Sequence, residues 1–454
     1  MSLASFIFFM IWAAWGQTLA KTNAISSGQP FWIVTNSIPA TNEITFPEFL
    51  NEVAQANLDY AAQRYNVDIA KAAIAIAKEF PNPTLQLNGD RDLTFHNKYG
   101  VGTDGKPALL RQVESRGVGL TQTIEYFGKR KWRIRTADHA YHAAAATLED
   151  FLRNLKLDAS ESFAEALATQ RTLEQQRKAA DYLNKLVAAQ RHRLAAGDIG
   201  ETDLTQSRVD ELRSENDLLN AQNDAQTAQL ALDTFLGRNR GQTTLVPRGK
   251  LELEPRSFDA SRLVASALQN RPDLVALRHS RDGAQSGVRL AKANRLPDVD
   301  VGVTYTHNDG VALNHPIDPT PAFDQLALSL SFPLPLWNRN KAEIATARFA
   351  AEQSEKQLEA AELKAEVQVR QTYSTYQLMQ ERVRKFQEEL LKGADDVLNA
   401  KRFSYEHGQT TLLDLLDAQR ADNDIHQSYN DALADVAKAL IELERAVGFW
   451  DVEL

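Results

Sequence analysis

The sequence contains no cysteine. Disulfide bonds, thiolate metal sites, cysteine catalysis and lipidation on an N-terminal cysteine are therefore excluded. The formal net charge of -9 leaves little of the clustered positive charge that nucleic-acid binding needs, so no nucleic-acid partner is expected. After residue 20 no apolar run is long enough for a membrane-spanning helix, and a mature chain that enters a membrane would have to do so as a closed β-barrel.

Catalytic and nucleotide-binding patterns are also missing. The sequence has no His-Glu-x-x-His, no Gly-x-Ser-x-Gly and no phosphate loop. His139 and His142 lie three residues apart in a helical pattern, but no carboxylate or third histidine is placed nearby in the sequence to complete a metal shell. We therefore expect no enzyme, no cofactor and no metal site.

The N-terminus predicts export. Residues 2–15 form an apolar run, and Thr18-Leu19-Ala20 suits a signal-peptidase site, so we predict a signal peptide at 1–20. An uncleaved membrane anchor is the alternative interpretation. Residues 21–45 are polar and contain proline, which indicates an N-terminal extension.

Very long helices dominate the rest of the chain. Residues 131–196 contain neither glycine nor proline, and apolar side chains recur there at steps of three and four. One helix over this segment would be ~100 Å long. Gly197 and Gly200 interrupt the pattern, and Gly408 interrupts a second such pattern, so each long segment should fold back on itself as a helical hairpin.

The two halves follow one plan at a spacing of roughly 210 residues. Gly197 matches Gly408, and Asp203 matches Asp414. We predict a first repeat at 46–237 with a helix, a strand hairpin at 84–124 and a helical hairpin at 129–236. A connector at 238–257 leads to a second repeat at 258–448, with a helix, a strand hairpin at 298–334 and a helical hairpin at 338–447. Residues 449–454 form a tail.

Alternating apolar and polar residues predict two strands in each half. Four strands cannot close a barrel, because membrane barrels start near eight strands. Closure therefore requires several chains, and three copies would supply roughly twelve strands, an even number within the known range.

This order of elements resembles the TolC family of outer-membrane efflux ducts. Three segments carry the resemblance most specifically. Residues 117–130 read Gly-Val-Gly-Leu-Thr-Gln-Thr-Ile-Glu-Tyr-Phe-Gly-Lys-Arg and are similar to the CzcC-like heavy-metal branch. Residues 329–340 read Ser-Leu-Ser-Phe-Pro-Leu-Pro-Leu-Trp-Asn-Arg-Asn in the matching position, and residues 405–417 are similar to the family's periplasmic aperture segment.

The resemblance implies a mainly α fold with a β-barrel. Three chains would form an α-helical tunnel in the periplasm and a 12-stranded transmembrane β-barrel in the outer membrane, with four strands per chain. It further implies a passive exit duct that works with a periplasmic adaptor and an inner-membrane pump of the RND type, with divalent metal cations among its solutes. A soluble periplasmic coiled-coil scaffold is the competing class.

The resemblance also points to a periplasmic aperture. Three copies would gather roughly six carboxylates from Asp414 and Asp417, and at least some of these should resist ionisation. The alternative is a solvated helix face. Tyr405 could donate its hydroxyl to Asp203 as a latch, at a tip where Thr410 stands in place of an arginine found in some relatives. The alternative is an unpaired, solvated Tyr405. The expected adaptor-docking tips are Gly197, Asp198, Gly408 and Gln409.

Aromatic residues gather where strands give way to helices. They are Tyr126, Phe127, Trp132 and Trp337, accompanied by Lys129, Arg130, Lys131 and Arg133. Amphipathic rings with cations suit a membrane interface and its phosphate head groups. The alternative is that these rings belong to an ordinary protein core.

Overall fold

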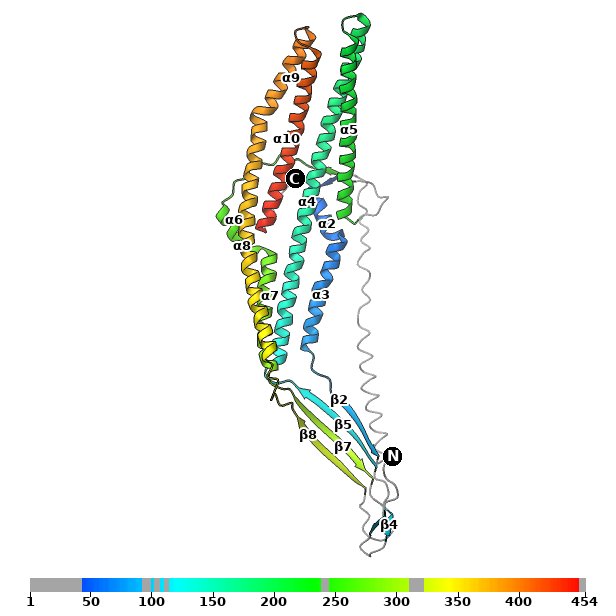
Figure 1. The fold of residues 1–454 in the computed structure, drawn as a ribbon, viewed down its shortest axis with the longest axis vertical. Helices are drawn as coiled ribbons and strands as arrows, with labels where there is room; N and C mark the ends of the chain where they lie inside the picture. The colour runs from blue at the N-terminus through cyan, green and yellow to red at the C-terminus, as the bar shows by residue number, and fades with distance from the viewer. Residues whose placement is uncertain are drawn as a thin grey trace. The chain divides into compact units, whose positions relative to one another are not determined.

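The computed structural model describes residues 43–91, 99–101, 107–109, 114–237, 245–309 and 322–448. The predicted signal peptide at 1–20, most of the extension at 21–45 and the tail at 449–454 lie outside these residues. Within the described residues, no helix combines the length and the apolar character required to cross a membrane. Long helices and one four-stranded sheet make up most of the described chain (Figure 1).

The first half begins with β1 (Glu43–Thr45), α2 (Phe46–Ala56) and α3 (Leu58–Lys78). It continues with strands β2 (Thr84–Arg91), β3 (Tyr99–Val101), β4 (Pro107–Leu109) and β5 (Glu114–Ile124). Helices α4 (Lys129–Ala196) and α5 (Glu201–Phe235) complete it. The one helix that we predicted before the first strand hairpin is instead two helices, α2 and α3, because Asn57 between them has an extended backbone. The Asn57 side chain accepts the N–H of Tyr60 and caps α3.

The second half repeats this order. Strand β6 (Val246–Arg248) lies in the predicted connector and pairs in parallel with β1. Then come α6 (Ala260–Asn270), α7 (Pro272–Asn294), β7 (Val299–Asn308) and β8 (Phe323–Ser331). The last elements are α8 (Lys341–Lys385), the π-helical turn η1 (Phe386–Leu390), α9 (Leu391–Glu406) and α10 (Leu412–Val447). The first long helix of the hairpin predicted at 338–447 therefore contains a π-turn, which the sequence pattern did not predict.

The sheet has the order β2-β5-β7-β8, with every pair antiparallel. Its register aligns Leu85, Leu120, Val303 and Leu328 in one row across all four strands. The next row in the same orientation is Leu87, Val118, Tyr305 and Leu326. The opposite face carries polar and small residues, such as Gln86, Gly119, Thr304 and Ala327. Because side chains alternate along a strand, the sheet has one apolar and one polar face.

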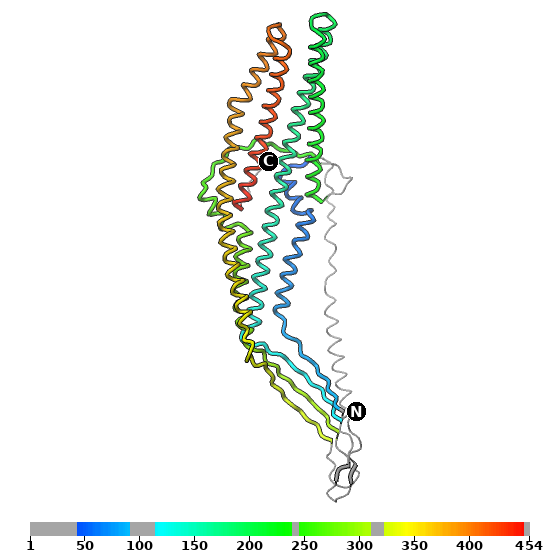
Figure 2. The backbone as a smooth tube through the Cα atoms, viewed as in Figure 1, coloured from blue at the N-terminus to red at the C-terminus, as the bar shows by residue number. Residues whose placement is uncertain are grey.

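Two helical hairpins form the other part of the described chain. Helices α4 and α5 run side by side, as do α9 and α10, and α10 also packs against α4 (Figure 2). The main core lies where α2, α4, α8 and α10 meet. There the Phe163 ring is fully buried and lies 5.4 Å from the rings of both Phe46 and Phe49. Burying these rings stabilises the packing of α2 on α4.

We expect Gly408→Ala to destabilise the second hairpin by about 1–2 kcal/mol, since Gly408 has a φ of +70° that side-chain-bearing residues avoid. The matched control is Gly393→Ala in α9. No atom lies within 4 Å of a β-carbon placed at either glycine, so packing is not the difference. Gly393→Ala should leave the hairpin unchanged or more stable by about 0.5–1 kcal/mol. Amide hydrogen exchange of residues 403–414 would measure the stability of the hairpin in both variants. Equal changes in stability would contradict the argument from the backbone conformation.

Candidate functional site

The tips of both hairpins have the same backbone structure. Gly197 and Gly408 end their helices with φ values of +84° and +70°. The N–H of Asp198 donates to the carbonyl of Arg193, and the N–H of Gln409 donates to that of Ser404. These bonds satisfy carbonyls that the helix ends would otherwise leave without partners. Glycine adopts a positive φ at little cost, which explains why the helices end at these two residues.

Asp414 is part of the cap of α10. It accepts hydrogen bonds from the hydroxyls of Thr411 at 2.7 Å and Thr410 at 2.8 Å, and from the Thr411 N–H at 3.2 Å. In return its own N–H donates to the Thr411 hydroxyl, which completes a capping box. The Thr411 hydroxyl is the largest of the causes that lower the pKa of Asp414 to about 2. Within one chain this carboxyl is therefore readily ionised, and the expectation that gathering three copies makes some of these groups resist ionisation stays a prediction.

Asp417 has a cationic partner. Its carboxylate accepts a hydrogen bond of 2.7 Å from Arg420, whose other nitrogen donates to Asp210 of α5 at 2.6 Å. The Asp210 side chain is buried, while that of Asp417 is exposed. Arg420 thus ties the second hairpin to the first and places a positive charge beside one of the two predicted aperture carboxylates.

The Tyr405 hydroxyl lies against α4. It accepts hydrogen bonds from Gln190 at 2.6 Å and from Arg193 at 2.9 Å. The Arg193 guanidinium also lies 5.3 Å from the centre of the Tyr405 ring. Within the described residues of one chain, Tyr405 does not bond to Asp203, so the predicted latch is not formed there. The two hairpins of one chain are joined instead through Gln190 and Arg193.

Apolar packing supports this contact. Leu183 of α4 packs with Leu412 and Leu416 of α10, and Tyr405 lies against this cluster. Beside it, a cavity of about 200 Å³ lies between α4, α5 and α10, lined mainly by polar side chains. Three lining atoms have no hydrogen-bond partner there, in Ser214, Gln419 and Asn423. The contact between the hairpins is therefore apolar near the tip and polar below it.

At the opposite end of the helices, most of the predicted head-group cations have partners within the chain. Lys129 is buried and donates to Asp298 at 2.8 Å. Arg133 pairs with Glu125 at 2.6 Å, and Arg130 donates to the carbonyl of Lys78 at the end of α3. These bonds fix the junction between helices and strands. Lys131, the remaining cation of this group, has no partner among the hydrogen bonds and ion pairs of the described chain.

The four aromatic residues of the predicted interface differ in environment. Trp132 is half-buried, with the Arg289 guanidinium 4.8 Å from its ring centre. Trp337 is 92% exposed, and Tyr126 and Phe127 are also exposed. Trp132 therefore belongs to the helical packing, whereas the other three remain candidates for contact with a lipid interface.

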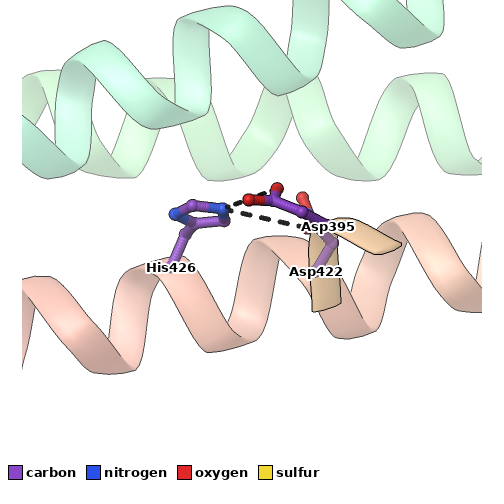
Figure 3. Close-up of side chains that lie close together, drawn as sticks. All are labelled: Asp395, Asp422 and His426. Carbon is purple, nitrogen blue, oxygen red and sulfur yellow. Dashed lines mark ion pairs between the residues drawn. The ribbon is translucent and has the colours of Figure 1, made fainter. Parts of the chain in front are cut away.

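The expectation that no carboxylate lies near the histidine pair of α4 is wrong, since an Asp138 carboxylate oxygen lies 3.9 Å from His142 Nε2. The pair also has a third histidine as a neighbour, which the sequence did not reveal. His279 of α7 lies with its ring centre 6.2 Å from that of His139 and 5.2 Å from that of His142. Burial lowers the pKa of His279, and His142 and His139 lower it further. Among the described residues, however, donor atoms that converge closely enough for a metal are found elsewhere, at Asp395, Asp422 and His426 (Figure 3).

Comparison with known proteins agrees with this architecture. The chain is 24% identical to the cobalt-zinc-cadmium resistance protein CzcC of Cupriavidus metallidurans, over 90% of this chain and 91% of that protein. It is 21% identical to the outer membrane protein TolC of Vibrio cholerae, over 86% of this chain and 87% of that protein.

Solved structures share the fold. The crystal structure of CusC matches with a TM-score of 0.71 at 18% identity, over 89% of this chain and 92% of that one. VceC from Vibrio cholerae matches with a TM-score of 0.69 at 17% identity, over 89% and 96%. The model of the family described as outer membrane efflux protein matches residues 49–238 and 263–449. The chain therefore belongs to the outer membrane efflux protein family, whose members are outer-membrane exit channels with a periplasmic helical domain and are not enzymes.

Proposed function

We propose that three copies of this chain assemble into one exit duct, each contributing four strands to a closed sheet of twelve. The observation that carries the proposal is the sheet itself. In the described part of the chain, β2 and β8 each pair with one sheet strand, so both edges carry backbone groups that a neighbouring chain can pair with. Joining β8 of one copy to β2 of the next would satisfy those groups.

The apolar face of the sheet supports its placement in lipid. Leu87, Leu326, Leu328 and Leu330 are among its most exposed side chains, with Leu328 80% exposed. Water does not favour such a continuous apolar surface, and lipid covers it without cost. The polar face would then line the passage. A soluble coiled-coil scaffold, the competing class, gives no reason for this exposed apolar face.

The helical hairpins would form the periplasmic part of the duct. Members of this family work with a periplasmic adaptor and an inner-membrane pump. In this chain we assign the adaptor contacts to the open tips at Gly197, Asp198, Gly408 and Gln409, and we take the pump to be of the RND type. Asp414 and Asp417, brought together from three copies, would form the aperture near these tips, and Tyr405 could reach Asp203 of a neighbouring copy there.

We infer that divalent metal cations are among the solutes. The relative CzcC is named a cobalt-zinc-cadmium resistance protein, and its similarity extends over most of both chains. An ionised Asp414 beside Asp417 gives the aperture a negative charge that favours cations. Growth of a strain lacking this gene on cobalt, zinc or cadmium salts would test this inference, and unchanged tolerance of all three would contradict it.

The two faces of β8 give a direct test of the lipid contact. Leu328→Arg on the apolar face should cost about 2–4 kcal/mol at the middle of a membrane and should reduce the amount of assembled protein in the outer membrane. The matched control is Ala327→Arg, one residue away on the polar face and also exposed. Fractionation followed by native gels would compare the two, and equal losses would contradict a lipid-facing apolar row.

A second test concerns the aperture. Conductance in planar bilayers should fall when a millimolar divalent cation is added on the tip side, and the Asp414→Ala, Asp417→Ala double variant should lose most of this block. In an Asp417→Ala variant, Asp414 carries the block that is retained. Because the pKa of Asp414 is about 2, this carboxylate stays ionised at about pH 4.5, and the block should persist there.

Asp414→Ala also removes part of a helix cap, so a control for structure is needed. Thr411→Ala removes the capping hydroxyl while keeping both carboxylates. The block should survive in Thr411→Ala if charge carries it. A double variant blocked as strongly as the parent would instead mean that the carboxylates are only a solvated helix face.

A further inference from the structure

One cluster of side chains lies outside the aperture and the interface between sheet and helices. It joins Asp395 of α9 to Asp422 and His426 of α10, and the close-up shows the three side chains meeting between the two helices (Figure 3). The His426 Nε2 atom lies 3.5 Å from Asp395 Oδ1 and 3.8 Å from Asp422 Oδ1. One nitrogen and two carboxylate oxygens lie within 4.8 Å of one another.

The burial of Asp422 makes this cluster more than a surface ion pair. Asp422 is only 6% exposed, and its Oδ1 atom has no hydrogen-bond partner. That oxygen is the one directed at His426. A buried carboxylate oxygen without a partner is costly, so a site of this kind favours a cation that would bind it. Burial also raises the pKa of Asp422.

We propose that Asp395, Asp422 and His426 bind one divalent transition-metal cation, of which Zn²⁺ and Co²⁺ fit best. Imidazole with two carboxylates suits these ions, whereas Ca²⁺ and Mg²⁺ prefer oxygen ligands alone. In a tetrahedral shell with ligand bonds of ~2.0–2.2 Å, neighbouring ligand atoms lie ~3.3–3.6 Å apart. The two measured separations from His426 are within a few tenths of an ångström of this range. The fourth position would be open to water on the exposed side of Asp395.

Neighbouring charge permits this ion. Two carboxylates with a neutral imidazole balance the charge of one divalent cation. Besides His426, the basic group that acts electrostatically on Asp422 is Arg402 of α9. Its guanidinium stacks 4.9 Å from the centre of the Tyr182 ring on α4. Arg402 is therefore held by an aromatic ring and forms no ion pair with Asp422 in the described chain.

The proposed site belongs to the second hairpin alone. The first hairpin has Asn184, Glu211 and Glu215 at the positions that match when Gly197 is aligned with Gly408. It has no imidazole there, so the duplication does not reproduce the donor set. A cation in the second hairpin would join α9 to α10 shortly after the π-turn η1, where α9 begins. The site thus differs from the aperture carboxylates and does not depend on which solute the duct carries.

Zinc binding to the purified full-length protein tests the proposal. Isothermal titration with ZnCl₂ of untagged protein in detergent should give one site per chain. His426→Ala should weaken that site at least about tenfold, the loss that removing an outer-shell partner alone already produces. Asp395→Asn should do the same without disturbing the interior, because Asp395 is more than half exposed. CoCl₂ in place of ZnCl₂ should give the strong visible absorption of tetrahedral Co²⁺, and His426→Ala should abolish it.

The control is His142→Ala. His142 also follows an aspartate by four residues, with its Nε2 3.9 Å from Asp138, but both side chains are half exposed. This variant should bind zinc like the parent. The proposal is overturned if the parent binds no zinc, or if His426→Ala binds it as tightly as the parent. It is also overturned if His142→Ala loses the site, because the ion would then lie on the histidines of α4 and α7.

Discussion

The structure depends on a sheet that one chain cannot complete. Four antiparallel strands give it one apolar face and two edges, at β2 and β8. Backbone groups at those edges need partners, and the exposed leucines of β8 need an apolar surrounding. Both needs are met together when further copies extend the sheet until it closes. Each pair of strands continues into a helical hairpin. Bonds such as that from Lys129 to Asp298 fix the junction between strands and helices.

The duplicated plan is not used identically in the two halves. Both hairpins end at a glycine with positive φ, but the second adds a capping box at Asp414 and the bridge from Arg420 to Asp210. It also brings Tyr405 onto α4. The bridge from Arg420 and the hydrogen bonds of Tyr405 attach the second hairpin to the first, whereas the capping box stabilises α10 itself. The hydrogen bonds of Tyr405 and Arg420 thus hold the two hairpins of one chain together.

Much of the fold could be predicted because it follows from local pattern. Helices free of glycine and proline, alternating strands and the breaks at Gly197 and Gly408 can all be recognised from neighbouring residues. The pattern missed the break at Asn57, where a side-chain cap replaces a helical turn, and the π-turn at 386–390, which composition does not mark.

The site was less predictable because its partners are distant in sequence. Nothing near Tyr405 indicates Gln190, and nothing near His142 indicates His279. One signal was available and not used. In a hairpin, residues nearly equidistant from the turn face each other, and Asp395 and Asp422 lie almost equally far from Gly408. With His426 one helical turn beyond Asp422, that symmetry would have revealed the cluster.

Disulfide cross-linking between sheet edges tests the central claim most directly, since the natural chain has no cysteine. Strands β2 and β8 are three steps apart in one sheet, ~14 Å, which is too far for a disulfide within a chain. Leu85→Cys can be combined in turn with Leu326→Cys, Leu328→Cys and Leu330→Cys, which share its face. We predict that one combination gives a covalent trimer on a denaturing, non-reducing gel and that each single variant does not. Monomers from every combination, or ladders longer than three, would contradict closure by three chains.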